Sequence, residues 1–152
     1  MHISNNARRP TGPLKLLFIE DNPTDQVLIG EMLQHNGGMK LECADCLAQG
    51  LEQLQKHDPE LVLLDMRLPD SEGLEGLERL QQRAPGMPVV VLTGTHDEAL
   101  AKQALANGAE DYLIKGEITP GSLRRSVRYA LQRQRVGEAL ALSADVLRAL
   151  NC

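Results

Sequence analysis

The chain has 152 residues, of which 42% are hydrophobic, so it can bury one ordinary core and we expect one compact domain with appendages. Its formal net charge of −5 argues against direct binding of nucleic acid, which requires a broad basic surface. No apolar run approaches the roughly 20 residues that span a bilayer, and the first residues lack the apolar core of a signal peptide, so we expect a cytoplasmic protein outside the membrane.

Apolar runs of strand length alternate along the chain with segments of helical spacing. The five candidate strands are residues 14–19, 39–44, 60–64, 88–92 and 111–114. Most are apolar on both faces, which is typical of a parallel sheet that helices cover on both sides. Residues 1–13, which come before the first strand, are expected to form a disordered arm.

Four helices are predicted between these strands. The first begins where Asn22 or Thr24 can cap it and ends at Gly37-Gly38. The other three are expected from about residues 47 to 57, 74 to 85 and 97 to 107. This alternation predicts an α/β fold, a doubly wound parallel sheet with right-handed crossovers.

Polar residues follow the strands of the predicted sheet at the edge where such sheets bind ligands. A carboxylate pair follows the first strand, a third carboxylate the third strand, a hydroxyl the fourth and a lysine the fifth. These residues are Glu20, Asp21, Asp65, Thr93 and Lys115. We expect them to lie close together.

The carboxylates of Asp21 and Asp65 would repel each other on adjacent strands unless a cation lay between them. Mg²⁺ suits such a site, because it prefers oxygen ligands, keeps several waters and binds one or two carboxylates together with a phosphate. We therefore expect direct ligation by Asp21 and Asp65, with Glu20 as a further ligand or one acting through water. A main-chain carbonyl after Asp65 could add another ligand.

A carboxylate beside a metal and a lysine can also act as a nucleophile toward a phosphoryl group. Lys115, the metal and the Thr93 hydroxyl would then stabilise the transferred oxygens. Each side chain also has a purely structural explanation, since Asp65 could cap a turn and Glu20 could be a solvated loop acid. We favour the functional interpretation because the residues occupy matching strand ends.

Four sequence blocks closely resemble, in order, the response-regulator receiver domain of two-component signalling. They are LLFIEDNPTD, LVLLDMRLPDSEGLEGL, PVVVLTGT and GAEDYLIKGE. The resemblance implies a flavodoxin-like, five-stranded sheet in the order 2-1-3-4-5 with five helices, of which the last extends at the C-terminus. It also implies a receiver domain over residues 14–135.

The resemblance assigns a role to each matching residue. It implies that Asp65 accepts a phosphoryl group from a sensor histidine kinase or a histidine phosphotransfer protein. Glu20 and Asp21 resemble the acidic pair that binds Mg²⁺, and the Arg67 carbonyl resembles the main-chain ligand.

The same resemblance extends to the switching residues. Thr93 resembles the hydroxyl that turns toward the phosphoryl group, Lys115 its cationic partner, and Tyr112 the aromatic whose rotamer follows the switch. The family usually has a proline after the lysine, often with a cis bond, where this chain has Gly116. We expect a trans bond there, because a cis bond without proline costs about 3 kcal/mol, and a more mobile loop.

The cysteines and histidines outside this edge are expected to be structural. Cys43 and Cys46 form a lone C-x-x-C, and we favour two small apolar residues at a strand-to-helix corner over a redox or metal site. His35, His57 and His96 occupy helix-end or loop contexts and are expected at the surface.

The end of the chain carries two patterns. Leu123, Val127 and Ala130 predict an apolar face that packs on the sheet as the fifth helix. Its arginines are expected to form a solvated or inter-subunit surface. Residues 136–152 repeat apolar positions at spacings of four and three, which indicates a helical homodimer or a linker to an output domain missing from this chain.

The leading hypothesis is a phosphorylation-controlled receiver, a signalling module more than a turnover enzyme, which catalyses its own phosphorylation and its own slow dephosphorylation. The alternative is a receiver-like interaction domain that works without phosphorylation, although the intact Asp65, Thr93 and Lys115 count against it. A phosphatase with an aspartyl-phosphate intermediate would be expected to carry a general acid where this chain has Arg67. It would also need room for a cap domain.

Overall fold

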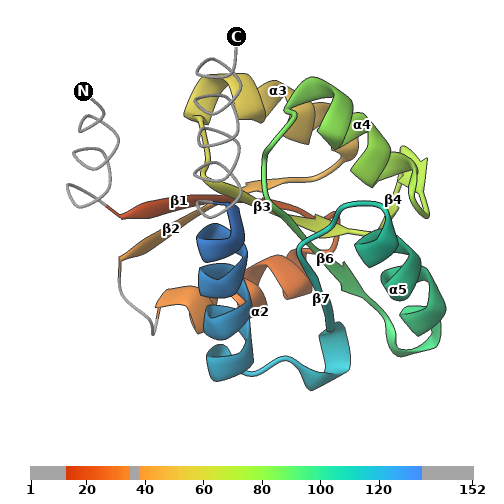
Figure 1. Ribbon diagram of the computed structural model, residues 1–152. Coiled ribbons are helices and arrows are strands. Elements are labelled where there is room, and N and C mark those ends of the chain that lie inside the picture. Colours follow the sequence, from red (N-terminus) through yellow and green to blue (C-terminus); the bar gives the residue numbers. More distant parts are fainter. Residues whose placement is uncertain (1–12, 35–37, 135–152) are drawn as a thin grey trace, which may run out of the picture.

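The computed structural model describes residues 13–34 and 38–134 (Figure 1). Their centre is a five-stranded, fully parallel sheet in the order β2-β1-β3-β6-β7. The strands are β1 (Leu14–Ile19), β2 (Met39–Ala44), β3 (Leu61–Asp65), β6 (Val89–Thr93) and β7 (Asp111–Ile114). Counted along this sheet alone, the order is 2-1-3-4-5, which confirms the predicted topology.

Helices cover both faces of the sheet. They are α2 (Pro23–Gln34), α3 (Leu47–His57), α4 (Glu75–Arg83), α5 (Glu98–Ala106) and a helix over residues 120–134. Helices α3, α4 and α5 pack on one face, whereas α2 and helix 120–134 pack on the other (Figure 1). The fold is therefore the predicted doubly wound, flavodoxin-like arrangement of five helices.

Alternate residues of the strands supply the two halves of the core. Val62 and Leu64 of β3 belong to the layer beneath α3 and α4, and Leu61 and Leu63 to the layer beneath α2. All five residues of β3 and of β6 are buried, as expected for central strands of a covered parallel sheet. The burial of β3 thus holds the carboxylate at its end in place.

Helix α3 lies unusually close to the sheet because of a glycine. A β-carbon at Gly50 would lie 2.7 Å from Cγ1 of Ile19 in β1 and would overlap the end of the same side chain. This close approach fixes the depth at which α3 sits on the sheet.

The start of α2 is capped as the sequence predicts. The Asn22 side-chain oxygen accepts hydrogen bonds from the backbone N–H groups of Thr24 and Asp25, at 2.8 and 3.2 Å. No helix in the described part of the chain is both long and apolar enough to cross a membrane.

The structure adds one element that the sequence analysis did not predict. Strands β4 (Arg67–Leu68) and β5 (Ser71–Glu72) form a small antiparallel hairpin directly after β3. Strands of two residues show no detectable periodicity, and Pro69 and Asp70 form the connection between them. Residues 1–12 of the arm predicted over residues 1–13, and the heptad segment at 136–152, lie outside the described residues, so the predicted division into three regions stays a prediction.

Asp70 in this hairpin caps a distant helix. Its carboxylate accepts hydrogen bonds from the N–H groups of Leu47 and Ala48, the first residues of α3, at 2.8 and 2.9 Å. Cys46, which precedes α3, makes no side-chain cap of its own. Burial alone would raise the pKa of Asp70, but these N–H groups outweigh it and hold the pKa below its ordinary value. The loop after β3 is thus fastened to the start of α3.

We expect Asp70→Ala to lower the free energy of unfolding by about 1 kcal/mol at pH 7, the usual effect of losing a helix cap. Because the folded-state pKa is depressed, this contribution is present above the ordinary carboxyl pKa of 3.8 and is lost as the pH falls below it. Urea denaturation at pH 7 and pH 3 measures both effects. Asp70→Asn, which keeps an acceptor oxygen, should retain most of the stability, and an equal loss in both variants would contradict the cap.

Candidate functional site

Four strands bring polar side chains together at one edge of the sheet. Glu20 follows β1, Asp65 ends β3, Thr93 ends β6 and Lys115 follows β7. Asp65 is paired in register with Leu92, and Thr93 with Ile114. The juxtaposition expected from the strand ends is therefore present.

The ammonium group of Lys115 lies among three carboxylates. Its Nζ is 2.6 Å from Glu20 Oε1, 3.0 Å from Asp25 Oδ2 and 3.3 Å from Asp65 Oδ2. The contacts with Asp25 and Asp65 are hydrogen bonds, whereas the contact with Glu20 is a close ion pair. Any new oxygen that Lys115 binds must therefore compete with these carboxylates for the ammonium group.

Asp25 is the member of this group that the sequence analysis missed. It lies in the first turn of α2, after the acidic pair Glu20-Asp21, and it is only partly exposed to solvent. An acid in the first turn of a helix is common for electrostatic reasons alone, so its type gave no signal of a site role. Its position one helical turn after Asp21 is the feature that could have indicated it.

Glu20, Asp21 and Asp65 form a compact acidic cluster. Each offers one carboxylate oxygen, and these oxygens lie within 4.8 Å of one another. Glu20 and Asp65 are buried, with exposed fractions of 0% and 6%, whereas Asp21 is exposed. A set of oxygen donors that is open to solvent on one side fits a hard divalent cation that keeps some of its waters.

Burial and crowding change the proton affinity of this cluster. Burial, followed by the hydrogen bond and charge of Asp65, raises the pKa of Glu20 to about 8, although Lys115 opposes the shift. Burial alone would lower the pKa of Lys115, but its bonds to Glu20 and Asp25 raise it. The carboxylates carry more negative charge than one ammonium can balance, so crowding favours the protonated form of Glu20 when no metal ion is bound.

The backbone after Asp65 also contacts the site. The N–H group of Arg67 donates to Asp65 Oδ1 at 3.1 Å, and the Arg67 side chain pairs with Asp97 at 2.9 Å. Asp65 thus has one oxygen on a backbone donor and the other facing Lys115. The role of the Arg67 carbonyl as a metal ligand stays a prediction.

Thr93 is buried, with an exposed fraction of 1%, and its hydroxyl has no hydrogen-bond partner within the described residues. An unsatisfied buried hydroxyl costs roughly 1–3 kcal/mol. Tyr112, on the neighbouring strand β7, is partly buried against the core layer beneath α3, α4 and α5. Gly116 lies in a short 3₁₀ turn, and its bond to Lys115 is trans, as predicted.

The remaining candidates lie away from this edge. Cys43 lies in β2 and Cys46 just before α3, and both are free thiols. Burial, with a smaller effect of Asp45, raises the pKa of the Cys43 thiol, which makes it a poor nucleophile at neutral pH. His57 and His96 are exposed as predicted, and His35 lies outside the described residues.

Comparison with known proteins places these features in a family. The sequence pattern of the response regulator receiver domain matches residues 16–128. The KDP operon transcriptional regulatory protein KdpE of Escherichia coli is 34% identical over 118 residues, which are 78% of this chain and 51% of KdpE. The response regulator protein PilR of Pseudomonas aeruginosa is 37% identical over 120 residues, covering 78% of this chain and 26% of PilR. The chain therefore spans about half of one relative and about a quarter of the other.

Solved structures agree with the sequence relatives. The response regulator receiver domain protein from Clostridium thermocellum superimposes with a TM-score of 0.73 at 28% identity, covering 81% of this chain and 98% of its own. The CheY-like receiver domain protein from Methanospirillum hungatei gives a TM-score of 0.69 at 26% identity, covering 83% and 99%.

The crowded carboxylates predict that Asp65→Asn stabilises the metal-free protein. Glu20 has a folded pKa of about 8 against an ordinary value of 4.5, so its contribution to stability is full below 4.5 and is lost as the pH rises through about 8. Removing the Asp65 charge lowers the pKa of Glu20, and we expect a gain of about 1–2 kcal/mol at pH 9 and less at pH 6.

Urea denaturation with a chelator present, at both pH values, measures this difference. Asp58→Asn removes a charge at an exposed position after α3 and is the matched control. The proposed repulsion would be contradicted if the stability of the parent did not fall between pH 6 and pH 9 and if Asp65→Asn were no more stable than the parent.

Proposed function

The chain belongs to the response regulator receiver domain family, and from this membership we propose that it takes a phosphoryl group on Asp65 and responds by changing a protein-binding surface. In this proposal a carboxylate oxygen of Asp65 attacks the phosphorus atom and the bond to the donor's leaving group breaks. The product is an acyl phosphate on the protein.

The observation that carries the proposal is the pairing of Asp65 with Lys115 inside an acidic cluster. Lys115 Nζ is 3.3 Å from Asp65 Oδ2, so a cation lies beside the nucleophile and can bind an oxygen of the incoming phosphoryl group. Glu20, Asp21 and Asp65 would hold Mg²⁺, which would neutralise charge on the transferred group. The Arg67 carbonyl is the further ligand in this proposal.

Thr93 and Tyr112 carry the proposed response. The Thr93 hydroxyl is buried without a partner in the described residues, so an oxygen of a phosphoryl group on Asp65 would satisfy it. Inward movement of Thr93 would let Tyr112 on the neighbouring strand follow. Because these contacts exist only in the phosphorylated form, they would shift the balance between two conformations of β7, α5 and helix 120–134.

The wider setting is also part of the proposal. The donor would be a sensor histidine kinase or a histidine phosphotransfer protein in the cytoplasm, and the acyl phosphate would hydrolyse slowly at the same site. The matched relatives are considerably longer than the matching segment, which supports an output domain linked to the receiver. A helical dimer through residues 136–152, which lie outside the described residues, stays a hypothesis.

We expect the parent protein to gain one phosphoryl group when it is incubated with a small-molecule phosphodonor and Mg²⁺, as measured by intact-mass spectrometry. Asp65→Asn should gain none, because an amide is not a comparable nucleophile. Asp21→Asn should react more slowly at low Mg²⁺ and recover in part at high Mg²⁺. Asp58→Asn controls for loss of charge, and equal labelling of the parent and Asp65→Asn would contradict the assignment.

We expect Thr93→Val to separate phosphorylation from switching. Valine has a similar shape and no unsatisfied hydroxyl, so the unmodified variant should be as stable as the parent or more stable by about 1 kcal/mol. It should still accept a phosphoryl group but show none of the amide NMR shift changes that phosphorylation produces around Tyr112 and α5. Thr93→Ser should keep those changes, and a full set of them in Thr93→Val would refute the coupling.

A further inference from the structure

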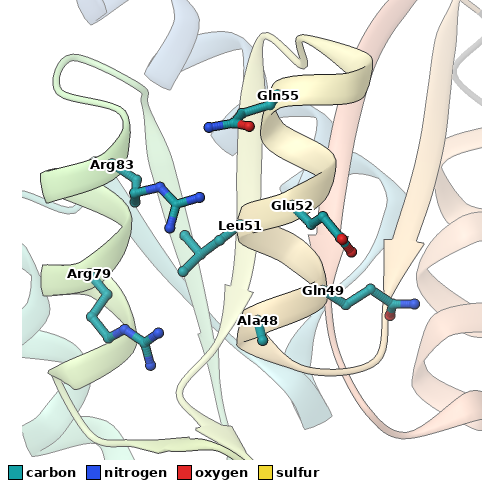
Figure 2. Close-up of a pocket in the computed structure, with 7 residues that line it drawn as sticks. All are labelled: Ala48, Gln49, Leu51, Glu52, Gln55, Arg79 and Arg83. Carbon is teal, nitrogen blue, oxygen red and sulfur yellow. The ribbon is translucent and has the colours of Figure 1, made fainter.

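A groove with a volume of about 510 Å³ runs between α3 and α4, away from the acidic edge (Figure 2). Side chains of both helices line it: Ala48, Gln49, Leu51, Glu52, Gln55, Arg79 and Arg83. Five of these seven residues are exposed, so the groove is open along its length rather than enclosed. Leu51, with an exposed fraction of 3%, provides an apolar floor.

One wall of the groove carries two cations, and the opposite wall carries one acidic residue, Glu52. Arg79 and Arg83 lie one helical turn apart on α4, and Figure 2 shows their guanidinium groups reaching toward α3. Neither forms an ion pair within the described residues, and the carboxylate of Glu52 points away from both (Figure 2). In a chain with a net charge of −5, this pair is a local concentration of positive charge.

The chemistry of the groove favours a peptide over a small molecule. A guanidinium binds a carboxylate through two parallel hydrogen bonds, and two of them on successive turns match two acidic side chains. Gln55 offers an amide group that can bond a peptide backbone, and Leu51 can receive an apolar side chain. A small metabolite is usually enclosed over most of its surface, which an open groove does not achieve.

We propose that the α3–α4 groove is a docking site for an acidic peptide segment of a partner protein, with Arg79 and Arg83 binding its carboxylates. This surface lies on different helices from the β7, α5 and helix 120–134 surface described above. It therefore gives the protein a second place for a partner.

Both walls of the groove are attached to the loop that follows Asp65. Asp70 binds the N–H groups of Leu47 and Ala48 at the start of α3, and Ala48 itself lines the groove. Helix α4 begins at Glu75, directly after the same loop. This second step rests on the proposed function: phosphorylation of Asp65 moves the loop and thereby changes the affinity of the groove for the peptide.

The test uses short fluorescein-labelled peptides that carry two glutamates one helical turn apart and a leucine between them. Fluorescence anisotropy with the full chain should show binding of the acidic peptides and loss of binding when glutamine replaces glutamate. R79Q/R83Q should weaken binding by about tenfold or more, because two charge pairs are lost. R125Q/R128Q removes the same charge from exposed positions on helix 120–134 and should leave the affinity unchanged.

Failure of every acidic peptide to bind the parent would overturn the docking site, and so would equal binding by the parent and R79Q/R83Q. A third contrary result is displacement of the peptide by free glutamate or phosphate at concentrations close to the dissociation constant of the peptide. That result would assign the groove to small anions.

The effect of phosphorylation is measured in the same assay after treatment with the phosphodonor, with intact mass recorded on each sample. A changed peptide affinity in the phosphorylated parent, absent in Asp65→Asn, is expected. Full phosphorylation with unchanged affinity would refute the coupling and leave the phosphoacceptor role intact. If the parent gains no phosphoryl group, the proposed function is refuted. Peptide binding by the unmodified protein then still tests whether the groove is a docking site.

Discussion

The ammonium group of Lys115, surrounded by the carboxylates of Glu20, Asp25 and Asp65, is the interaction on which the rest of the site depends. It joins the end of β7 to the end of β1, the first turn of α2 and the end of β3. One cation cannot balance this many carboxylates, so the site needs a proton on Glu20 or a divalent ion. In the proposed function, this excess of negative charge would supply the affinity for Mg²⁺ and would leave the carboxylate of Asp65 beside the Lys115 ammonium group.

The scaffold holds these charges in place through burial of the strands that carry them. Strands β3 and β6 are buried along their whole length, so Asp65 and Thr93 cannot withdraw from the edge without disrupting the core. The loop after β3 is fastened in turn, because Asp70 caps α3 from a distance. In the proposed function, a change at Asp65 would reach two different surfaces, one through Thr93 and β7 and the other through the hairpin and α3.

Much of this arrangement was predictable because it depends on local patterns and strand ends. Glu20, Asp65, Thr93 and Lys115 each adjoin an apolar strand, and parallel strands bring their carboxyl ends to one edge. The spacing of Asp25 one helical turn after Asp21 was the only hint in the sequence, because its contact with Lys115 depends on how α2 is rotated on the sheet. The cap formed by Asp70 and the groove between α3 and α4 likewise arise from tertiary packing between segments that are distant in the sequence. Strands β4 and β5 are too short to give a periodic pattern.

The most direct test of the central interaction is the titration of the Glu20 side chain, followed by carbon-13 NMR of its carboxyl group in protein free of divalent ions. The crowded, buried site predicts a pKa raised from the ordinary 4.5 to about 8, and a large fall in that pKa when saturating Mg²⁺ is added. Titration at the ordinary value of 4.5 without metal, unchanged by Mg²⁺, would show that the carboxylates do not share one buried site and would contradict the account.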